Sequence, residues 1–201
     1  NMTTGEGGCI VTDTENTLQK MKIMRFHGIS KDAFNRFSKE GNLLYDVIAP
    51  GYKYNMMDLQ AALGIHQLAA LEGFIERRNT LVARYQDIFK DWPELTIPSL
   101  PSYDHLHAWH LYIPLLNLES VSLSRDEVLT KMKEHNIGLG FHYQAPHLFT
   151  YYRENYGYRE GNFPTAEDFS KRAMSLPLFP TMTEKDQNDV VEALRIVLRG
   201  A

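Results

Sequence analysis

Three short polar stretches of the sequence hold side chains that could bind a ligand or move a proton. In "FHYQAPH", His142 ends an apolar run that is interrupted by glycines. Histidine is the usual residue for proton transfer near neutral pH. In "PGYKYNMMD", Lys53 and Asn55 precede a long helical pattern, whose N-terminus would itself attract an anion. In "YYRENYGYRE", Tyr152 and Arg153 belong to an aromatic and basic cluster of a composition common where flat polar ligands bind. A strand-end histidine bonded to a carbonyl group and a solvated loop explain the first two equally well, and the third has no spacing that specifies a reaction.

The histidine-rich stretch "HLHAWH" does not have the pattern of a metal site. On a strand, His105 and His107 share one face while His110 points to the other. Because no acidic residue sits at ligand spacing on the same strand, we predict no metal site. Cys9, the single cysteine, follows the Gly-rich "TTGEGG" in a short apolar run that we expect to be a strand, where a thiol is inert packing.

Composition excludes several classes of protein. The 21 basic and 25 acidic residues are interleaved and give a net charge of −4, which does not resemble a nucleic-acid-binding surface. No apolar run approaches the ~20 residues that span a bilayer. One cysteine permits no internal disulfide and fits a reducing compartment, so we expect a cytoplasmic protein.

The first part of the chain is predicted to be mainly helical. Asp13 or Thr14 can cap a helix that runs to Met24, and a long apolar stripe predicts a second helix from Met56 to Phe89. Between them, "HGISKDAFNRFSKEGNLLYDVIAPG" reads as a functional loop. "ERRN", at residues 76–79, reads as a solvated or subunit-facing helix surface. The Pro-rich "DWPELTIPSLPS" ends the stripe, and we place a domain boundary between residues 92 and 93.

Beyond this boundary, strands and helices alternate. "HAWHLYIPLL" and "IGLGFHY" are predicted strands, and "SLPLFP" is a predicted extended piece. Ser124 with Glu127 forms a capping box, Thr165 precedes a short helix, and Thr183 with Asp186 caps a last helix. This order is typical of a small α/β domain.

Taken in order, these phrases resemble the C-terminal half of the sugar aminotransferases of the DegT/StrS type, a family of pyridoxal-phosphate enzymes. The matching phrases are "TTGEGGCIVTD", "RFHGIS", "PGYKYNMMDLQAALG", "HAWHLY", "GLGFHYQAPH", "YYRE" and "SLPLFP", from residue 3 to about residue 183. The resemblance implies an α/β fold, with residues 1–92 as the end of the large cofactor-binding domain of an aspartate-aminotransferase-like fold. Residues 93–201 would form the small C-terminal α/β domain. "GYKYN", "HAWHL" and "SLPLFP" look most like the branch that aminates a UDP-linked 4-keto-pentose, giving 4-amino-4-deoxy-arabinose for lipid A.

The resemblance also implies roles for individual residues. The lysine that forms the Schiff base with pyridoxal 5'-phosphate is expected directly before Asn1, so this chain alone is expected to be inactive. Lys53 and Asn55 match a loop that crosses the interface of a homodimer to the cofactor phosphate of the other subunit. His142, with Tyr152 and Arg153, matches positions near the sugar substrate. The amino donor would be glutamate, and the acceptor a nucleotide-linked keto sugar.

Two other interpretations stay open at this point. The chain could belong to a related pyridoxal-phosphate enzyme that dehydrates sugars, in which His replaces the cofactor lysine. It could also be a non-catalytic dimerisation module. A lysine directly before Asn1 would indicate an aminotransferase, and a histidine there would indicate the dehydrating enzyme. A dimerisation module would bind no cofactor.

Overall fold

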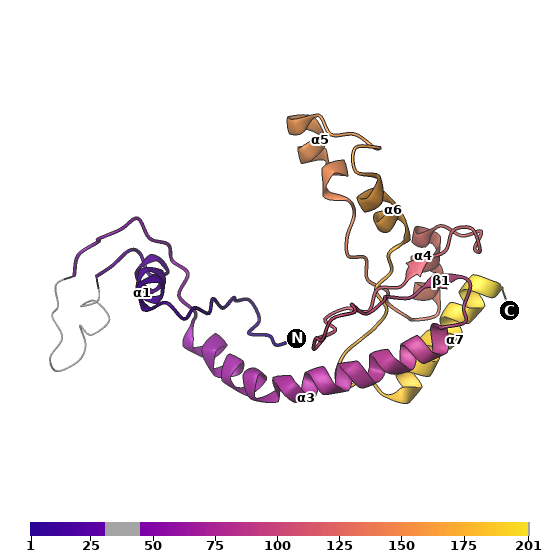
Figure 1. Ribbon diagram of the computed structural model, residues 1–201, viewed down its shortest axis with the longest axis horizontal. Helices are drawn as coiled ribbons and strands as arrows, with labels where there is room; N and C mark the ends of the chain where they lie inside the picture. Colours follow the sequence, from indigo (N-terminus) through magenta and orange to yellow (C-terminus); the bar gives the residue numbers. More distant parts are fainter. Residues whose placement is uncertain (31–44, 201) are drawn as a thin grey trace. The chain divides into compact units, whose positions relative to one another are not determined.

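The computed structural model describes residues 1–30 and 45–200, and its contacts divide the chain into two compact units. The first unit is Met2–Leu71, and the second begins at Glu72 and includes Asn1. The division falls within α3 (Asp58–Phe89), the long helix that the apolar stripe predicts (Figure 1). The division between the contact units therefore lies earlier in the chain than the predicted boundary at residues 92 and 93. The reason is that the last turns of α3 pack into the core of the second unit. The boundary at 92 and 93 stays a prediction for the domains of the complete protein.

The first unit contains α1 (Glu15–Met24), which confirms the first predicted helix. Thr14 occupies the N-cap position without a side-chain cap bond, and its carbonyl accepts from Leu18 N at 3.0 Å. The predicted strand at residues 9–12 is wrong: the run is not a strand, and Cys9 is an exposed free thiol. A strand needs a neighbouring strand to bond its backbone, and no described residue pairs with this run. Most of the predicted functional loop, residues 31–44, lies outside the described residues.

The sheet of the second unit is short and antiparallel. β1 (Leu95–Thr96) pairs with β2 (Leu115–Leu116), with Leu95 opposite Leu116. Isolated bridges extend it: Leu115 pairs with Ala173, Tyr112 with Leu176, and Gly140 with Ser175. The first two residues of "SLPLFP", Ser175 and Leu176, are thus extended as predicted, and they pair with Gly140 and Tyr112 respectively.

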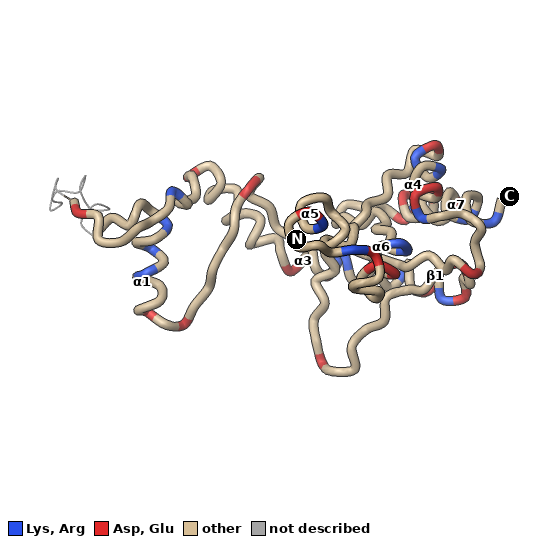
Figure 2. Tube along the Cα trace, turned by 90° about the horizontal axis from the view of Figure 1, so that it is seen from above, with Lys and Arg blue, Asp and Glu red and all other residues tan. Residues whose placement is uncertain are grey.

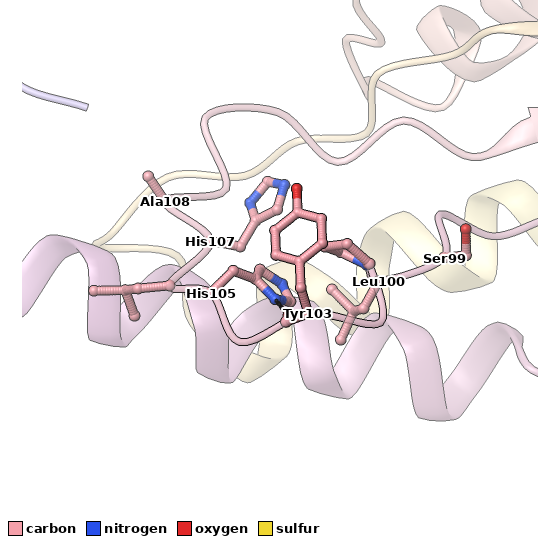
Figure 3. Close-up of a pocket in the computed structure, with 8 residues that line it drawn as sticks. Ser99, Leu100, Tyr103, His105, His107 and Ala108 are labelled. Atoms are coloured by element: carbon pink, nitrogen blue, oxygen red, sulfur yellow. Dashed lines mark hydrogen bonds between the residues drawn. The ribbon is translucent and has the colours of Figure 1, made fainter.

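The two longer strands predicted from "HAWHLYIPLL" and "IGLGFHY" are largely wrong. Only Leu115–Leu116 is a regular strand, and the second stretch contributes one bridge residue, Gly140. Trp109 has a φ of 42°, which breaks an extended chain, and Pro114 has no N–H to donate to a ladder. Before Trp109, His105 and His107 line an open recess together with Tyr103 (Figure 3).

Helices cover this sheet and build the core. α4 (Arg125–Glu134) begins with the predicted Ser124–Glu127 capping box, and α7 (Glu184–Arg199) begins with the predicted Thr183–Asp186 box. Acidic and basic residues are interspersed along both helices (Figure 2). α7 lies along the second half of α3 in Figure 1, where the buried Gln187 Nε2 donates to Leu81 O at 2.9 Å. The fully buried large side chains are Tyr85, Tyr112, Phe89, Leu81, Leu116, Met132, Met174, Met182, Leu194, Gln187, Val82 and Val128. None of the described helices is both long and apolar enough to cross a bilayer.

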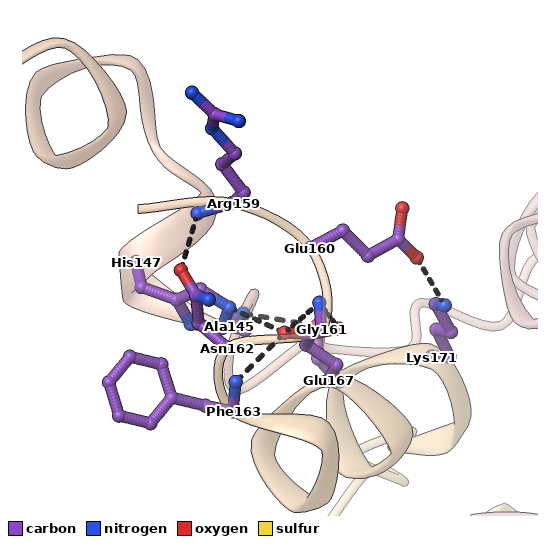
Figure 4. Close-up of polar contacts among 10 residues, drawn as sticks. Ala145, His147, Arg159, Glu160, Gly161, Asn162, Phe163, Glu167 and Lys171 are labelled. Atoms are coloured by element: carbon purple, nitrogen blue, oxygen red, sulfur yellow. Dashed lines mark hydrogen bonds and ion pairs between the residues drawn. The ribbon is translucent and has the colours of Figure 1, made fainter. Parts of the chain in front are cut away.

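A buried hydrogen bond between a histidine and a carboxylate fixes the segment that carries α5 (Thr150–Tyr156) and α6 (Pro164–Arg172). The predicted short helix is confirmed, but it begins at Pro164 and therefore includes Thr165, which the sequence predicts to precede it. Before α5, a 3-10 turn at Pro146–Leu148 places His147 Nε2 2.8 Å from Glu167 Oε1 on α6 (Figure 4). The Glu167 carboxylate also accepts from Gly161 N at 2.9 Å and Phe163 N at 3.1 Å. These bonds close the loop between the two helices around one carboxylate.

The core predicts a strong position effect for leucine truncation. Leu194 on α7 is 0% exposed, whereas Leu106 is 80% exposed. We expect Leu194→Ala to lower the free energy of unfolding by about 2–5 kcal/mol, because it leaves a cavity in the packed core. Leu106→Ala should change it by less than about 0.5 kcal/mol. Urea unfolding followed by circular dichroism measures both, and equal losses would contradict the assignment of the core.

The buried Glu167 carboxylate predicts that the stability of the fold changes with pH in a defined direction. The backbone N–H groups of Gly161 and Phe163, then His147, hold the pKa of Glu167 below its usual 4.5. A carboxyl whose pKa is lower in the folded state stabilises the fold above its unfolded pKa, and that stability is lost as pH falls through the folded pKa. We therefore expect the Tm of the wild type to fall more between pH 6 and pH 3 than the Tm of Glu167→Gln. Parallel curves for the two proteins would show that Glu167 does not contribute in this way.

Candidate functional site

In the first unit, backbone pairing holds the stretch that contains Lys53. Tyr52 N donates to Met24 O at 2.7 Å, and Tyr54 N donates to Arg25 O at 2.8 Å. The side chains of an extended stretch alternate, so Tyr52 and Tyr54 stack with ring centroids 5.0 Å apart while Lys53 points to the other side. There its Nζ lies 4.5 Å from the centre of the Phe26 ring. The pairing therefore fixes where the ammonium group can reach.

Two glycines make this pairing possible. A Cβ on Gly51 would lie 1.9 Å from Gly28 N, and a Cβ on Gly28 would lie 1.7 Å from Ala49 O. Gly28 also has a φ of 69°, a conformation that side chains disfavour. The clashes are with backbone atoms, which cannot rotate away, so both positions require glycine.

The end of the stretch offers groups that suit a phosphate. Lys53 is exposed and forms no ion pair with any described residue. Asn55 Oδ1 is buried and has no hydrogen-bond partner in the described part of the chain. An amide oxygen accepts, so a phosphate would bond to the Asn55 Nδ2–H group and not to this oxygen. α3 begins at Asp58, and its N-terminal N–H groups favour negative charge. An ammonium, an amide and a helix N-terminus within a few residues fit a phosphate group.

The Gly-rich segment before residue 9 lies along the start of α3 in the same unit. Thr3 N donates to Gln67 Oε1 at 3.1 Å, and Gln60 Nε2 donates to Glu6 O at 2.6 Å. A small recess is lined by residues 2–9 and Met56. A Cβ on Gly7 would lie 2.5 Å from Thr4 Oγ1, so the segment is folded tightly on itself.

In the second unit, His142 follows the bridge between Gly140 and Ser175. Its Nδ1 lies 2.7 Å from Ser175 Oγ, and its ring is partly buried. Its Nε2 makes no hydrogen bond with a described residue and is not among their buried unpartnered atoms. The ring therefore has one fixed nitrogen and one that is left for a ligand.

Tyr152 and Arg153 lie on α5 and are both exposed. Tyr152 stacks with Tyr156 at a centroid distance of 6.1 Å, and Gly157, whose φ is 69°, caps the C-terminus of α5. The Arg153 side chain forms no ion pair with any residue the structure describes. The structure therefore places Tyr152 and Arg153 side by side on one helix, and their roles in substrate binding stay predictions.

Two of the three histidines of "HLHAWH" each use a ring nitrogen locally. His105 Nδ1 lies 2.8 Å from Tyr103 O, and His107 Nδ1 accepts from Trp109 N at 2.9 Å. The His107 ring also stacks on Trp109 at 3.9 Å. Within residues 1–30 and 45–200, no group of three or more His, Cys, Asp or Glu side chains could hold a metal ion.

Arg78 is the residue that sequence reasoning misplaced. The prediction of a solvated or subunit-facing surface for "ERRN" is wrong at this position, because Arg78 is 9% exposed. Its Nη1 donates to Trp109 O at 3.0 Å, to His110 O at 3.1 Å and to Leu178 O at 3.1 Å. Burial lowers the pKa of Arg78, and burial followed by neighbouring positive charge lowers the pKa of His110. Arg78 shares a helical face with the buried Leu81, Val82, Tyr85 and Phe89, and this spacing was the signal that could have found it.

Known proteins resemble the chain over nearly all of its length. Residues 1–195 match the model of the DegT/DnrJ/EryC1/StrS aminotransferase family. Spore coat polysaccharide biosynthesis protein SpsC of Bacillus subtilis is 44% identical over 202 residues, covering 100% of this chain and 52% of SpsC. The uncharacterized protein MJ1066 of Methanocaldococcus jannaschii is 42% identical, covering 98% of this chain and 51% of its own. The chain thus spans about half the length of the curated relatives it matches.

Solved structures of aminotransferases share the fold. Spr1654 of Streptococcus pneumoniae, named as a sugar aminotransferase, matches in its PMP form with a TM-score of 0.81 at 27% identity, covering 96% of this chain and 47% of Spr1654. Its PLP form matches with a TM-score of 0.79 at 25% identity. Helicobacter pylori PseC, an aminotransferase involved in the biosynthesis of pseudoaminic acid, has a TM-score of 0.81 at 22% identity and covers 95% of this chain and 48% of PseC.

These neighbours confirm the predicted α/β fold of the pyridoxal-phosphate-dependent aminotransferases. The PLP and PMP forms of Spr1654 confirm pyridoxal phosphate as the cofactor of this group of proteins. On the match of residues 1–195, the chain belongs to the DegT/DnrJ/EryC1/StrS aminotransferase family.

Proposed function

We propose that the complete protein transfers an amino group from glutamate to the keto group of a nucleotide-linked sugar. Family membership supports amino transfer, and the relatives named for polysaccharide or sugar biosynthesis support a sugar acceptor. The observation in this chain that carries the proposal is the exposed ammonium group of Lys53, which forms no ion pair with any described residue and lies close in sequence to Asn55 and the N-terminus of α3. This is a fitting site for the phosphate that the family's cofactor bears.

Each candidate residue has a role in this proposal. Lys53 and Asn55 bind the cofactor phosphate, by charge and by hydrogen bonding respectively. Bound pyridoxal phosphate would act as the electron sink and carry the amino group between the two substrates. His142 binds the sugar through its free ring nitrogen, and Tyr152 with Arg153 binds the nucleotide part. A guanidinium group suits the diphosphate and a tyrosine ring suits a flat base.

A UDP-linked 4-keto-pentose is the first candidate substrate, on the resemblance of "GYKYN", "HAWHL" and "SLPLFP" to the branch that supplies amino-arabinose for lipid A. SpsC takes its name from spore coat polysaccharide, and PseC acts in pseudoaminic acid biosynthesis. These names favour a surface-polysaccharide sugar as the second candidate. Both candidates are nucleotide-linked keto sugars, so transfer of the amino group to the keto carbon would be the same reaction for each.

We also propose that the protein works as a homodimer with its active sites at the interface. Leu59, Ile65 and Leu68 on the first half of α3 are exposed, as is Tyr54 in the cofactor stretch. Exposed apolar side chains of this size are typical of surfaces that another subunit or the rest of the complete protein covers. We place the reaction in the cytoplasm, in keeping with the free thiol of Cys9.

The proposed activity predicts a substrate ranking. The complete protein, supplied with pyridoxal phosphate and glutamate, should release 2-oxoglutarate when a UDP-linked 4-keto-pentose or 4-keto-6-deoxyhexose is added. Pyruvate, a keto acid without a sugar, serves as the comparison and should support little release. Transfer to pyruvate but to neither sugar nucleotide would overturn the proposal.

The phosphate site predicts a loss of cofactor affinity. Lys53→Ala and Asn55→Ala in the complete protein should each weaken binding of pyridoxal phosphate by about 10–100-fold, because each removes a bond to a charged group. Lys20→Ala, which removes an exposed lysine from α1, is the matched control and should bind normally. Titration of the apoprotein by absorbance measures all three. Unchanged affinity in both site variants would show that another residue binds the phosphate.

A further inference from the structure

The Ser175 hydroxyl is a buried polar group aimed at the ring of His142. Ser175 is 4% exposed, and its Oγ lies 2.7 Å from His142 Nδ1. Its backbone is already occupied, since Ser175 N donates to Gly140 O and Ser175 O accepts from Gly140 N, both at 2.9 Å. The hydroxyl is therefore the one polar group of Ser175 left for a side-chain partner.

Gly140 brings the ring and the hydroxyl together. A Cβ at this position would lie 2.7 Å from His142 Cε1 and 3.2 Å from Nδ1. It would also lie 3.2 Å from Ser175 Cβ. The imidazole thus packs directly over the glycine, next to the bridge that fixes Ser175. The backbone bridge and the missing side chain together set the ring position.

The direction of the hydrogen bond follows from what each partner can do. A buried O–H needs an acceptor, and Nδ1 of His142 is the one acceptor that described residues offer to the Ser175 hydroxyl. If the hydroxyl donates to Nδ1, the proton of the neutral imidazole lies on Nε2. A proton on Nδ1 would instead make Ser175 the acceptor and leave its own O–H buried without a partner.

We propose that Ser175 is a positioning residue that holds His142 as the Nε2–H tautomer. His142 then offers a hydrogen-bond donor to the ligand, and its preferred contact is an oxygen acceptor, such as a sugar hydroxyl or keto oxygen. The role of this donor in binding the sugar rests on the proposed function. The tautomer itself does not, because it is set by Ser175 and Gly140 in the absence of substrate.

The test compares buried serines in the complete protein with labelled histidine side chains. Ser175→Ala removes the hydroxyl, Ser175→Thr keeps it, and Ser170→Ala is the matched control. Ser170 is 7% exposed, and its hydroxyl accepts from Ala145 N at 3.1 Å. Nitrogen-15 spectra of the imidazole ring report which nitrogen carries the proton, and His142→Gln assigns the signals. Thermal unfolding of each variant confirms that it is folded.

We expect the wild type, Ser175→Thr and Ser170→Ala to show His142 protonated on Nε2 alone, and Ser175→Ala to show both tautomers. In the assay, Ser175→Ala should raise KM for the keto sugar about 10-fold and leave KM for glutamate unchanged. A wild-type signal from Nδ1–H, or the same tautomer in Ser175→Ala, would overturn the proposal. The expected spectra without amino transfer to any sugar would instead refute the proposed function and leave the positioning role of Ser175 standing.

Discussion

The second unit depends on one extended segment, Ala173–Leu176, that is bonded on both sides. On one side, Met174 N donates to Pro114 O at 3.2 Å and Leu176 N donates to Tyr112 O at 3.0 Å. On the other side, Ser175 exchanges two bonds with Gly140. Because the side chains alternate, the same segment sends Met174 into the core and Ser175 to the ring of His142. Core packing and the geometry of the candidate site therefore share one piece of backbone.

Arg78 supports the same region from α3 by an unusual arrangement. A buried guanidinium is costly because it loses its water, and here the described residues give it no carboxylate in exchange. Carbonyl oxygens from the chain at Trp109, His110 and Leu178 replace the water at Nη1, while Nε is buried without a hydrogen-bond partner among the described residues. The bonds tie α3 to the segment before Tyr112 and to the segment after Leu176. One side chain thus holds the ends of the two backbone stretches that pair in the sheet.

The helices could be predicted from the sequence because their signals are local. The Ser124–Glu127 and Thr183–Asp186 boxes are confirmed, since the bonds join residues three apart. The strands could not be predicted as well, because Gly140 pairs with Ser175 and Tyr112 pairs with Leu176, far along the chain. The same limit applies to the candidate site. His142 stood out by residue type, but nothing local to it pointed to Ser175, and the charge of Arg78 concealed its place on a buried helical face.

The Lys53 stretch and the α5 residues Tyr152 and Arg153 differ in how much substitution the surrounding backbone tolerates. This difference bears on specificity. The Lys53 stretch depends on Gly28 and Gly51, where any side chain would meet backbone atoms at less than 2 Å. Such a stretch tolerates little change, which suits the proposed role of Lys53 in binding the cofactor phosphate. Tyr152 and Arg153 lie exposed on a short helix that is tied down through His147 and Glu167, so their side chains can be replaced without disturbing the core. Under the proposed function, we therefore expect differences in the sugar nucleotide between relatives to coincide with substitutions in α5 and its loop, and fewer substitutions in the stretch around Lys53.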